Sequence, residues 1–226
     1  GLMALGSFSG GTYGTGTLSA GADNRYRLGG GGGILTFSQA DVLSGSATGV
    51  AIGSATMGGN GTVRFNAAQG HALPVTVVHG STLQGVGQLA ADASAFGKGA
   101  LTLDGGVLHL INNGAKTYST NSSLTFAGGG RLVFSVADWQ VNSMQFENLV
   151  RSATHRGSLI FSAANVGTGV GRNEGRVLVS NPPATVSVNN ATGTMAAPYF
   201  VKDDNFFLTY GLNGFEKAVY SATADL

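Results

Sequence analysis

GTVRFNAAQGHALPVTVVHGSTLQ, residues 61–84, contains three short strand patterns separated by corners. Residues 61–65 alternate apolar and polar side chains, as a half-buried strand does. The polar connection that follows, residues 66–74, is marked by Gly and Pro. Residues 75–78 and 82–84 are two further extended pieces, divided at Gly80. A strand, a corner, a strand, a corner and a third strand together make one coil of a β-solenoid.

The phrase "Gly, any residue, Leu, Val or Ile, any residue, apolar residue" recurs along the chain. Its copies begin at Gly33, Gly61, Gly99, Gly106, Gly130, Gly157 and Gly175. The gaps between these glycines are 28, 38, 7, 24, 27 and 18 residues, an irregular repeat in the period range of solenoids. One such unit cannot bury its apolar face alone, so the units must stack. We therefore predict an all-β, right-handed parallel β-helix of roughly nine coils, about 40 Å long.

The composition narrows the class of protein. Of 226 residues, 38 are Gly, and charged residues make up 10%, against about 25% in ordinary domains. Twelve Lys and Arg against eleven Asp and Glu give a net charge of +1, with no basic run for nucleic acid. Cys is absent, which excludes disulfides and thiolate metal sites. No apolar run is long enough for a transmembrane helix. These features favour a secreted or bacterial cell-surface protein.

The chain divides into a repeat region and an aromatic tail. Residues 1–181 carry the repeats, and Pro182-Pro183 ends them. Residues 182–226 are a predicted cap or docking element of the same domain. Since residue 1 lies within a Gly-rich pattern and is not Met, we expect a mature piece or an internal segment of a longer protein. The tail could cover the last open coil or dock on a neighbour; its candidate self-association residues are Tyr199, Phe200, Phe206, Phe207, Tyr210 and Phe215.

Three segments have two interpretations each. The five glycines of residues 29–33 are a flexible linker or a tight corner, and the strand patterns on both sides favour the corner. Residues 88–96 are the best local helix candidate, or an irregular excursion. Residues 139–150 form an amphipathic helical turn or a strand with Met144, Phe146 and Leu149 inward, and we favour the strand.

Residues 61–84 resemble the autotransporter-associated β-strand repeat. The matching positions are Asn66 in the corner, the extended run 75–78, Gly80, and Thr82-Leu83-Gln84. This copy departs from the usual pattern, because residues 70–74 read GHALP where a Tyr-Thr-Gly usually lies. The flank that contains residues 26–36 and the tail at residues 204–214 also look like parts of very long bacterial surface proteins. The resemblance implies a parallel β-helix, secretion and a surface role, and it brings no catalytic residues.

Several motifs suggest chemistry, and for each we favour a structural interpretation. Residues 85–90, GVGQLA, fit the G-x-G-x-x-A dinucleotide fingerprint, with Asp104 further on, but no full helix or βαβ unit follows. None of the histidines has metal-ligand spacing to another His or a carboxylate. We predict no cofactor and no metal site. The histidines are His71, His79, His109 and His155, of which His109 is expected to face solvent, and the candidate carboxylates of a β-helix hydrolase or lyase are Asp104, Asp138 and Glu147.

Aromatic residues are interpreted either as sugar-binding platforms or as core. Tyrosine rings and the aromatic tail can stack on sugars. The phenylalanines that end the strand phrases share the phase of the inward Leu or Val, so we predict that they fill the core. The tyrosine candidates are Tyr13, Tyr26 and Tyr118, and the core phenylalanines are Phe37, Phe65, Phe126, Phe134 and Phe161.

The sequence favours a non-enzymatic structural role. A solenoid with no visible polar cap at residue 1 leaves strand edges that pair with further coils or with a partner. Non-closing, head-to-tail contacts of that kind generate filaments. We therefore expect a structural element that forms or extends an extracellular fibre or stalk, through self-association or further repeats. The alternatives are an adhesin that binds glycans or other cells and, third, a polysaccharide-cleaving enzyme on the same scaffold.

Overall fold

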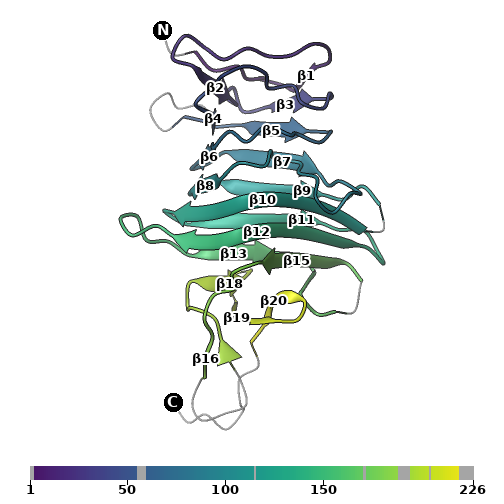
Figure 1. Ribbon diagram of the computed structural model, residues 1–226, viewed down its shortest axis with the longest axis vertical. Coiled ribbons are helices and arrows are strands. Elements are labelled where there is room, and N and C mark those ends of the chain that lie inside the picture. Colours follow the sequence, from purple (N-terminus) through teal and green to yellow (C-terminus); the bar gives the residue numbers. More distant parts are fainter. Residues whose placement is uncertain are drawn as a thin grey trace.

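The computed structural model describes residues 3–54, 60–114, 116–169, 172–187, 194–203 and 205–218. These residues form a column of stacked coils, with the first strands at one end and the C-terminal segment at the other (Figure 1). No helix occurs among them, and the stacked strands are parallel. The predicted all-β solenoid is therefore confirmed, with about six turns.

Two sheets run the length of the column. From β1 to β13 the strands alternate between them along the chain, so each turn contributes one strand to each sheet. One sheet contains β2 (Arg25–Leu28), β4 (Gly49–Ile52), β6 (Val75–Val78), β8 (Leu101–Asp104), β10 (Lys116–Ala127), β12 (Val141–Arg151), β15 (Glu174–Val179) and β14 (Asn165–Val166). The other contains β1 (Gly11–Tyr13), β3 (Ile34–Phe37), β5 (Thr62–Phe65), β7 (Thr82–Val86), β9 (Val107–Ile111), β11 (Gly130–Ser135), β13 (Leu159–Ser162) and β18 (Phe200–Lys202).

The turns have a regular length that the glycine spacing conceals. The paired residues Leu5, Leu28, Ile52, Val77, Leu103, Phe126 and Arg151 lie in one row down the first sheet. Their steps are 23, 24, 25, 26, 23 and 25 residues. The prediction of roughly nine coils was wrong, because each turn also contains long corners. At about 4.8 Å a turn, six turns span roughly 30 Å.

Each turn has a third side, and in the first half of the column this side contains few regular strands. Leu18 pairs with Leu43 only through an isolated bridge. Below it the buried Gln69 replaces strand pairing: its Oε1 accepts from the Val42 N–H at 3.1 Å and its Nε2 donates to the Gln39 carbonyl at 3.0 Å. Further down, the long β10 and β12 extend along this side and into the first sheet. Residues 139–150 thus contain a strand, as predicted, with Met144 and Phe146 buried.

Apolar side chains in register fill the interior. All five predicted core phenylalanines are buried. Phe37 stacks on Phe65 with ring centroids 5.3 Å apart, and Tyr13 packs on Phe37 at 5.6 Å. Gly85 occupies the next position of this row, paired with Phe65. A Cβ there would lie 2.6 Å from the ring of Phe96, which is fully buried.

Of the two interpretations of residues 88–96, the irregular excursion is correct and the helix is not. These residues form a corner of turns and bends between β7 and β8. The buried Ser94 bonds its own corner, because its Oγ donates to the Gly97 carbonyl at 2.7 Å and accepts from the Phe96 N–H at 3.0 Å. Side chains of this kind compete with helical hydrogen bonds. The corner instead delivers Phe96 into the space beside Gly85.

The glycine run at residues 29–33 is a corner between β2 and β3, as predicted. Gly29, Gly30, Gly31 and Gly32 all have positive φ, which side chains rarely tolerate. A Cβ on Gly33 would lie 2.7 Å from the Gly10 nitrogen in the turn above. Glycine is therefore required here by both backbone conformation and close stacking of turns.

The C-terminal strands end the parallel stacking. β19 (Phe206–Gly211) pairs antiparallel with β18, and β20 (Gly214–Lys217) pairs antiparallel with β19. β16 (Val186–Ser187) and β17 (Thr194–Met195) form a separate two-stranded ladder. Among the described residues, no helix reaches the length and hydropathy that crossing a membrane requires.

Candidate functional site

The N-terminal end of the column is an open turn. Among the described residues, β1 is the last strand of its sheet and pairs only with β3 below. The Tyr13 carbonyl accepts from the Ser38 N–H, so Tyr13 directs its backbone groups downward. Since successive residues of a strand direct these groups to opposite sides, Thr12 directs its N–H and C=O to the open edge. The backbone groups of Leu5 and Leu18 also bond to the turn below. By the same alternation, the residues beside them direct N–H and C=O groups outward on the other two sides of the open turn.

Apolar side chains accompany this edge. Met3, Leu5 and Phe8 are all exposed, and Leu18 is only partly covered. An unpaired, apolar strand edge is a template for pairing with another strand. The open turn thus combines unpaired backbone groups with an uncovered apolar interior.

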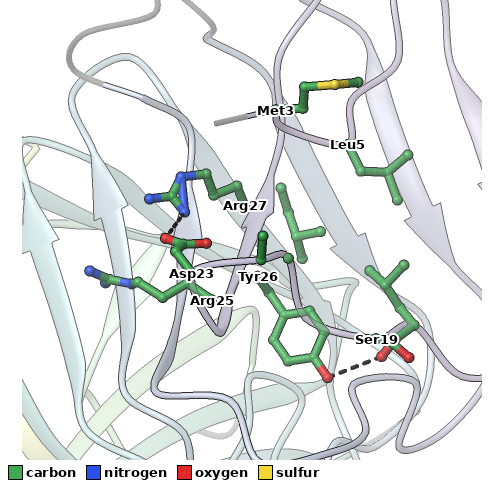
Figure 2. Close-up of a pocket in the computed structure, with 11 residues that line it drawn as sticks. Met3, Leu5, Ser19, Asp23, Arg25, Tyr26 and Arg27 are labelled. Atoms are coloured by element: carbon green, nitrogen blue, oxygen red, sulfur yellow. Dashed lines mark hydrogen bonds and ion pairs between the residues drawn. The ribbon is translucent and has the colours of Figure 1, made fainter. Parts of the chain in front are cut away.

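A cavity of about 220 Å³ lies at this end. Figure 2 shows the Asp23 carboxylate joined to Arg27 at its mouth and the Tyr26 hydroxyl pointing at the backbone beside Ser19. The lining residues are Met3, Leu5, Leu18, Ser19, Gly21, Ala22, Asp23, Arg25, Tyr26, Arg27 and Leu28.

Asp23 and Tyr26 in the cavity already have polar partners. Asp23 Oδ2 lies 2.6 Å from Arg27, whose hydrogen bond lowers the pKa of that carboxyl. The Tyr26 hydroxyl lies 3.0 Å from the Leu18 carbonyl and also contacts the Ser44 carbonyl, while burial raises the pKa of the phenol. Tyr26 is buried, so its prediction as a sugar platform was wrong.

The C-terminal end is covered by the aromatic tail. Phe200 and Phe215 are buried, with ring centroids 4.8 Å apart, and Phe215 packs on Phe161 of the last full turn at 4.9 Å. The Tyr210 hydroxyl accepts from the Val179 N–H at 2.8 Å and donates to the Val179 carbonyl at 3.0 Å. One side chain therefore pairs the backbone groups that Val179, on the edge of β15, would otherwise expose.

The six predicted self-association residues divide by burial. Phe200 and Phe215 are inside the cap, and Tyr199 and Tyr210 are partly buried against it. Only Phe206 and Phe207 are exposed, with the Lys217 ammonium 3.6 Å from the centroid of the Phe206 ring. Self-association through the last two stays a prediction. The sequence did not distinguish cap from surface, because both are aromatic.

In the structure, the glycines of the dinucleotide fingerprint at residues 85–90 have a packing role. Val86 ends β7 and no helix follows it in the described residues. A Cβ on Gly85 would lie 2.5 Å from the Ala95 Cβ, and a Cβ on Gly87 2.7 Å from Thr117 Oγ1. Gly85 thus leaves room for the corner of its own turn, and Gly87 allows the next turn to approach. They do not open a helix toward a phosphate, as the fingerprint requires.

The structure keeps the three candidate carboxylates apart. Asp104 ends β8 in register with Ala127, Glu147 lies within β12, and Asp138 lies in the corner after β11. In the described part of the chain, no three His, Asp or Glu side chains come close enough to hold a metal ion. His109 faces outward but is half-buried between Gln84 at 3.1 Å and Ser135 at 2.7 Å.

The imidazole ring of His71 is buried in an unusual environment. The ring lies against Gly97, and neither nitrogen has a hydrogen-bond partner among the described residues. Burial lowers the pKa of His71, and nearby Asp41 only partly opposes this. The unfolded chain therefore binds a proton more readily than the folded chain in the pH range just below the ordinary pKa of about 6.5.

We expect stability to fall as the pH drops from about 7.5 to about 5, because protonating His71 requires charging a buried ring. His71→Leu removes this titration and should flatten the pH dependence of the urea midpoint. His109, whose pKa burial also lowers, accounts for a remaining slope. His155→Gln, at an exposed site, is the control. An unchanged slope in His71→Leu would contradict this assignment.

Comparison of the chain with models of protein families, with curated protein sequences and with solved structures finds no significant match. Its function is therefore inferred from the geometry of the column and its two ends.

Proposed function

We propose that this chain is a non-enzymatic structural element of a secreted or cell-surface β-solenoid protein, related to autotransporter-associated repeat passengers. It forms or extends an extracellular fibre or stalk. The observation that carries the proposal is the asymmetry of the column. The C-terminal end is closed by buried aromatic rings, whereas the N-terminal turn is open on its strand edges and apolar inside.

The occupant that fits the open turn is another solenoid coil. Such a coil offers backbone groups at the strand spacing of about 4.8 Å and inward Leu, Val or Phe side chains in the same phase. It would pair with the outward groups of Thr12 and cover Leu5 and Leu18. Among the described residues neither a metal cluster nor a grouped set of candidate carboxylates points to catalysis.

The test is the mass of the chain before and after denaturation, together with one edge variant. We expect the wild-type chain to associate as its concentration rises. Thr12→Pro should abolish association without changing the stability of the monomer, since proline removes an outward N–H and is tolerated in edge strands. Thr12→Val, which keeps the N–H, is the matched control. A wild-type chain that stays monomeric at every concentration would contradict the proposal.

A further inference from the structure

Trp139 has a backbone conformation that does not suit its side chain. Five described residues other than glycine have positive φ, and four of them are Asn or Asp, which tolerate it: Asn24, Asp41, Asn173 and Asp203. The fifth is Trp139, with φ of 62°. A bulky residue in this region is strained, and such strain gathers at functional sites. The strain is not offset by burial, because 68% of Trp139 is exposed.

The neighbouring turn holds the indole in place. The backbone N–H of Trp139 donates to Asn173 Oδ1 at 3.1 Å, and Asn173 Nδ2 donates to Asp138 Oδ1 at 2.7 Å. Arg172 Cζ lies 4.3 Å from the centroid of the Trp139 ring. The Arg172 backbone is fixed in turn, since its carbonyl accepts from Asn165 Nδ2 at 2.8 Å. Two corners are thus bonded together around a ring that faces solvent.

We propose that this corner, defined by Asp138, Trp139, Arg172 and Asn173, binds an oligosaccharide. The exposed indole offers a flat apolar surface on which the C–H face of a pyranose ring stacks. No carboxylate lies within ion-pair distance of the Arg172 guanidinium among the described residues, so its N–H groups can donate to sugar hydroxyls. The Asp138 carboxylate has further lone pairs to accept from them. A charged donor stacked on the indole and a charged acceptor on the preceding residue suit a small polar ring.

A protein partner fits this corner less well. A stable protein interface buries about 800 Å² on each side around an apolar centre. Here a single ring is surrounded by an arginine, an aspartate and an asparagine. The opposite charges of Arg172 and Asp138 also give the corner no net attraction for a nucleic acid.

Trp139 is the single tryptophan of the chain, so its fluorescence reports this corner alone. The probes are cellohexaose and mannohexaose, which are neutral, and hexagalacturonate, which is acidic. We expect at least one to change the emission saturably in the millimolar range or below, with the same affinity by calorimetry. Preference for hexagalacturonate would show that Arg172 pairs with a carboxylate. Preference for a neutral sugar would show that Arg172 donates hydrogen bonds to hydroxyls. No change with any of the three would overturn the proposal.

Two variants separate binding from folding. Trp139→Asn places a residue that tolerates positive φ at this position. It should weaken binding roughly tenfold or more by calorimetry, without lowering the thermal midpoint. Arg172→Gln should also weaken binding. Leu89→Asn, at another exposed apolar residue, should leave it unchanged. Unchanged binding in Trp139→Asn, whether or not the thermal midpoint falls, would show that the ring has only a structural role and would overturn the proposal. Association through Thr12 is measured separately, so the two proposals can fail independently.

Discussion

Replacement of Arg176 by Met is expected to lower the free energy of unfolding by about 3–5 kcal/mol at neutral pH. Its partner Glu174 is completely buried, with its two carboxylate oxygens 2.9 and 3.0 Å from the Arg176 Nε and NH2 atoms. The Gly169 N–H donates to the same carboxylate at 2.9 Å. Removing the guanidinium takes two charge-assisted hydrogen bonds from a buried carboxylate, and breaking a buried ion pair in this way costs far more than the pair itself contributes.

Urea denaturation of two further variants isolates the cause. The double variant Glu174→Gln with Arg176→Met removes the charge as well as its partner, so it should recover a large part of the loss. Arg27→Met removes an arginine whose partner Asp23 is exposed to solvent, so it should cost much less than Arg176→Met. Equal losses in Arg176→Met and Arg27→Met would contradict the importance of burial.

Replacement of Phe200 by Ala is expected to cost about 3–5 kcal/mol. Phe200 is 1% exposed, and its ring centroid lies 5.7 Å from that of Phe126 and 4.8 Å from that of Phe215. Deleting the ring opens a cavity between the last full turn and the cap. The edge of that turn should then become exposed, so we also expect aggregation on partial denaturation.

Phe206→Ala is the matched control for the cap. Phe206 is 39% exposed and contacts Lys217 at the surface. Its loss should change the free energy of unfolding by no more than about 0.5–1 kcal/mol. Similar losses for both variants, measured by denaturant unfolding, would show that Phe200 does not close the column.

The strands were predictable because their signal is local. The phrase that begins at Gly61 alternates inward and outward side chains, and each of its copies lies on a strand of the structure. The same phase placed Phe37 and Phe161 in the core correctly. A pattern of period two is sufficient for this, because burial on one face selects it.

The turn length was not predictable from the glycines, for a structural reason. Gly33 and Gly61 precede strands of one sheet and Gly130 begins another strand of it, whereas Gly99 precedes β8 of the other sheet and Gly175 lies in β15. The same sequence phrase therefore marks different sides of a turn. The number of residues between successive copies corresponds in some cases to a whole turn and in others to part of one. The row from Leu5 to Arg151 shows the true period only once the pairing is known.

Other features depend on contacts between distant residues. Gln69 and Ser94 read as ordinary polar corner residues, yet the side chain of Gln69 replaces strand pairing and that of Ser94 bonds its own corner in the interior. Trp139 reads as the start of a strand, yet it lies in the corner before β12 with positive φ. No local pattern shows that Asn173 holds it, because the two residues meet only when the turns stack.

The most direct test of the structural role is hydrogen exchange at the Thr12 amide in assembled and dissociated protein. The account predicts slow exchange at Thr12 in the assembly, approaching that of Thr36 in the interior strand β3, and fast exchange after dissociation. Pairing of the open edge with another coil would produce this difference. An assembly in which Thr12 still exchanges quickly, while amides around Phe206 and Phe207 become protected, would show that the open turn is not the joining surface.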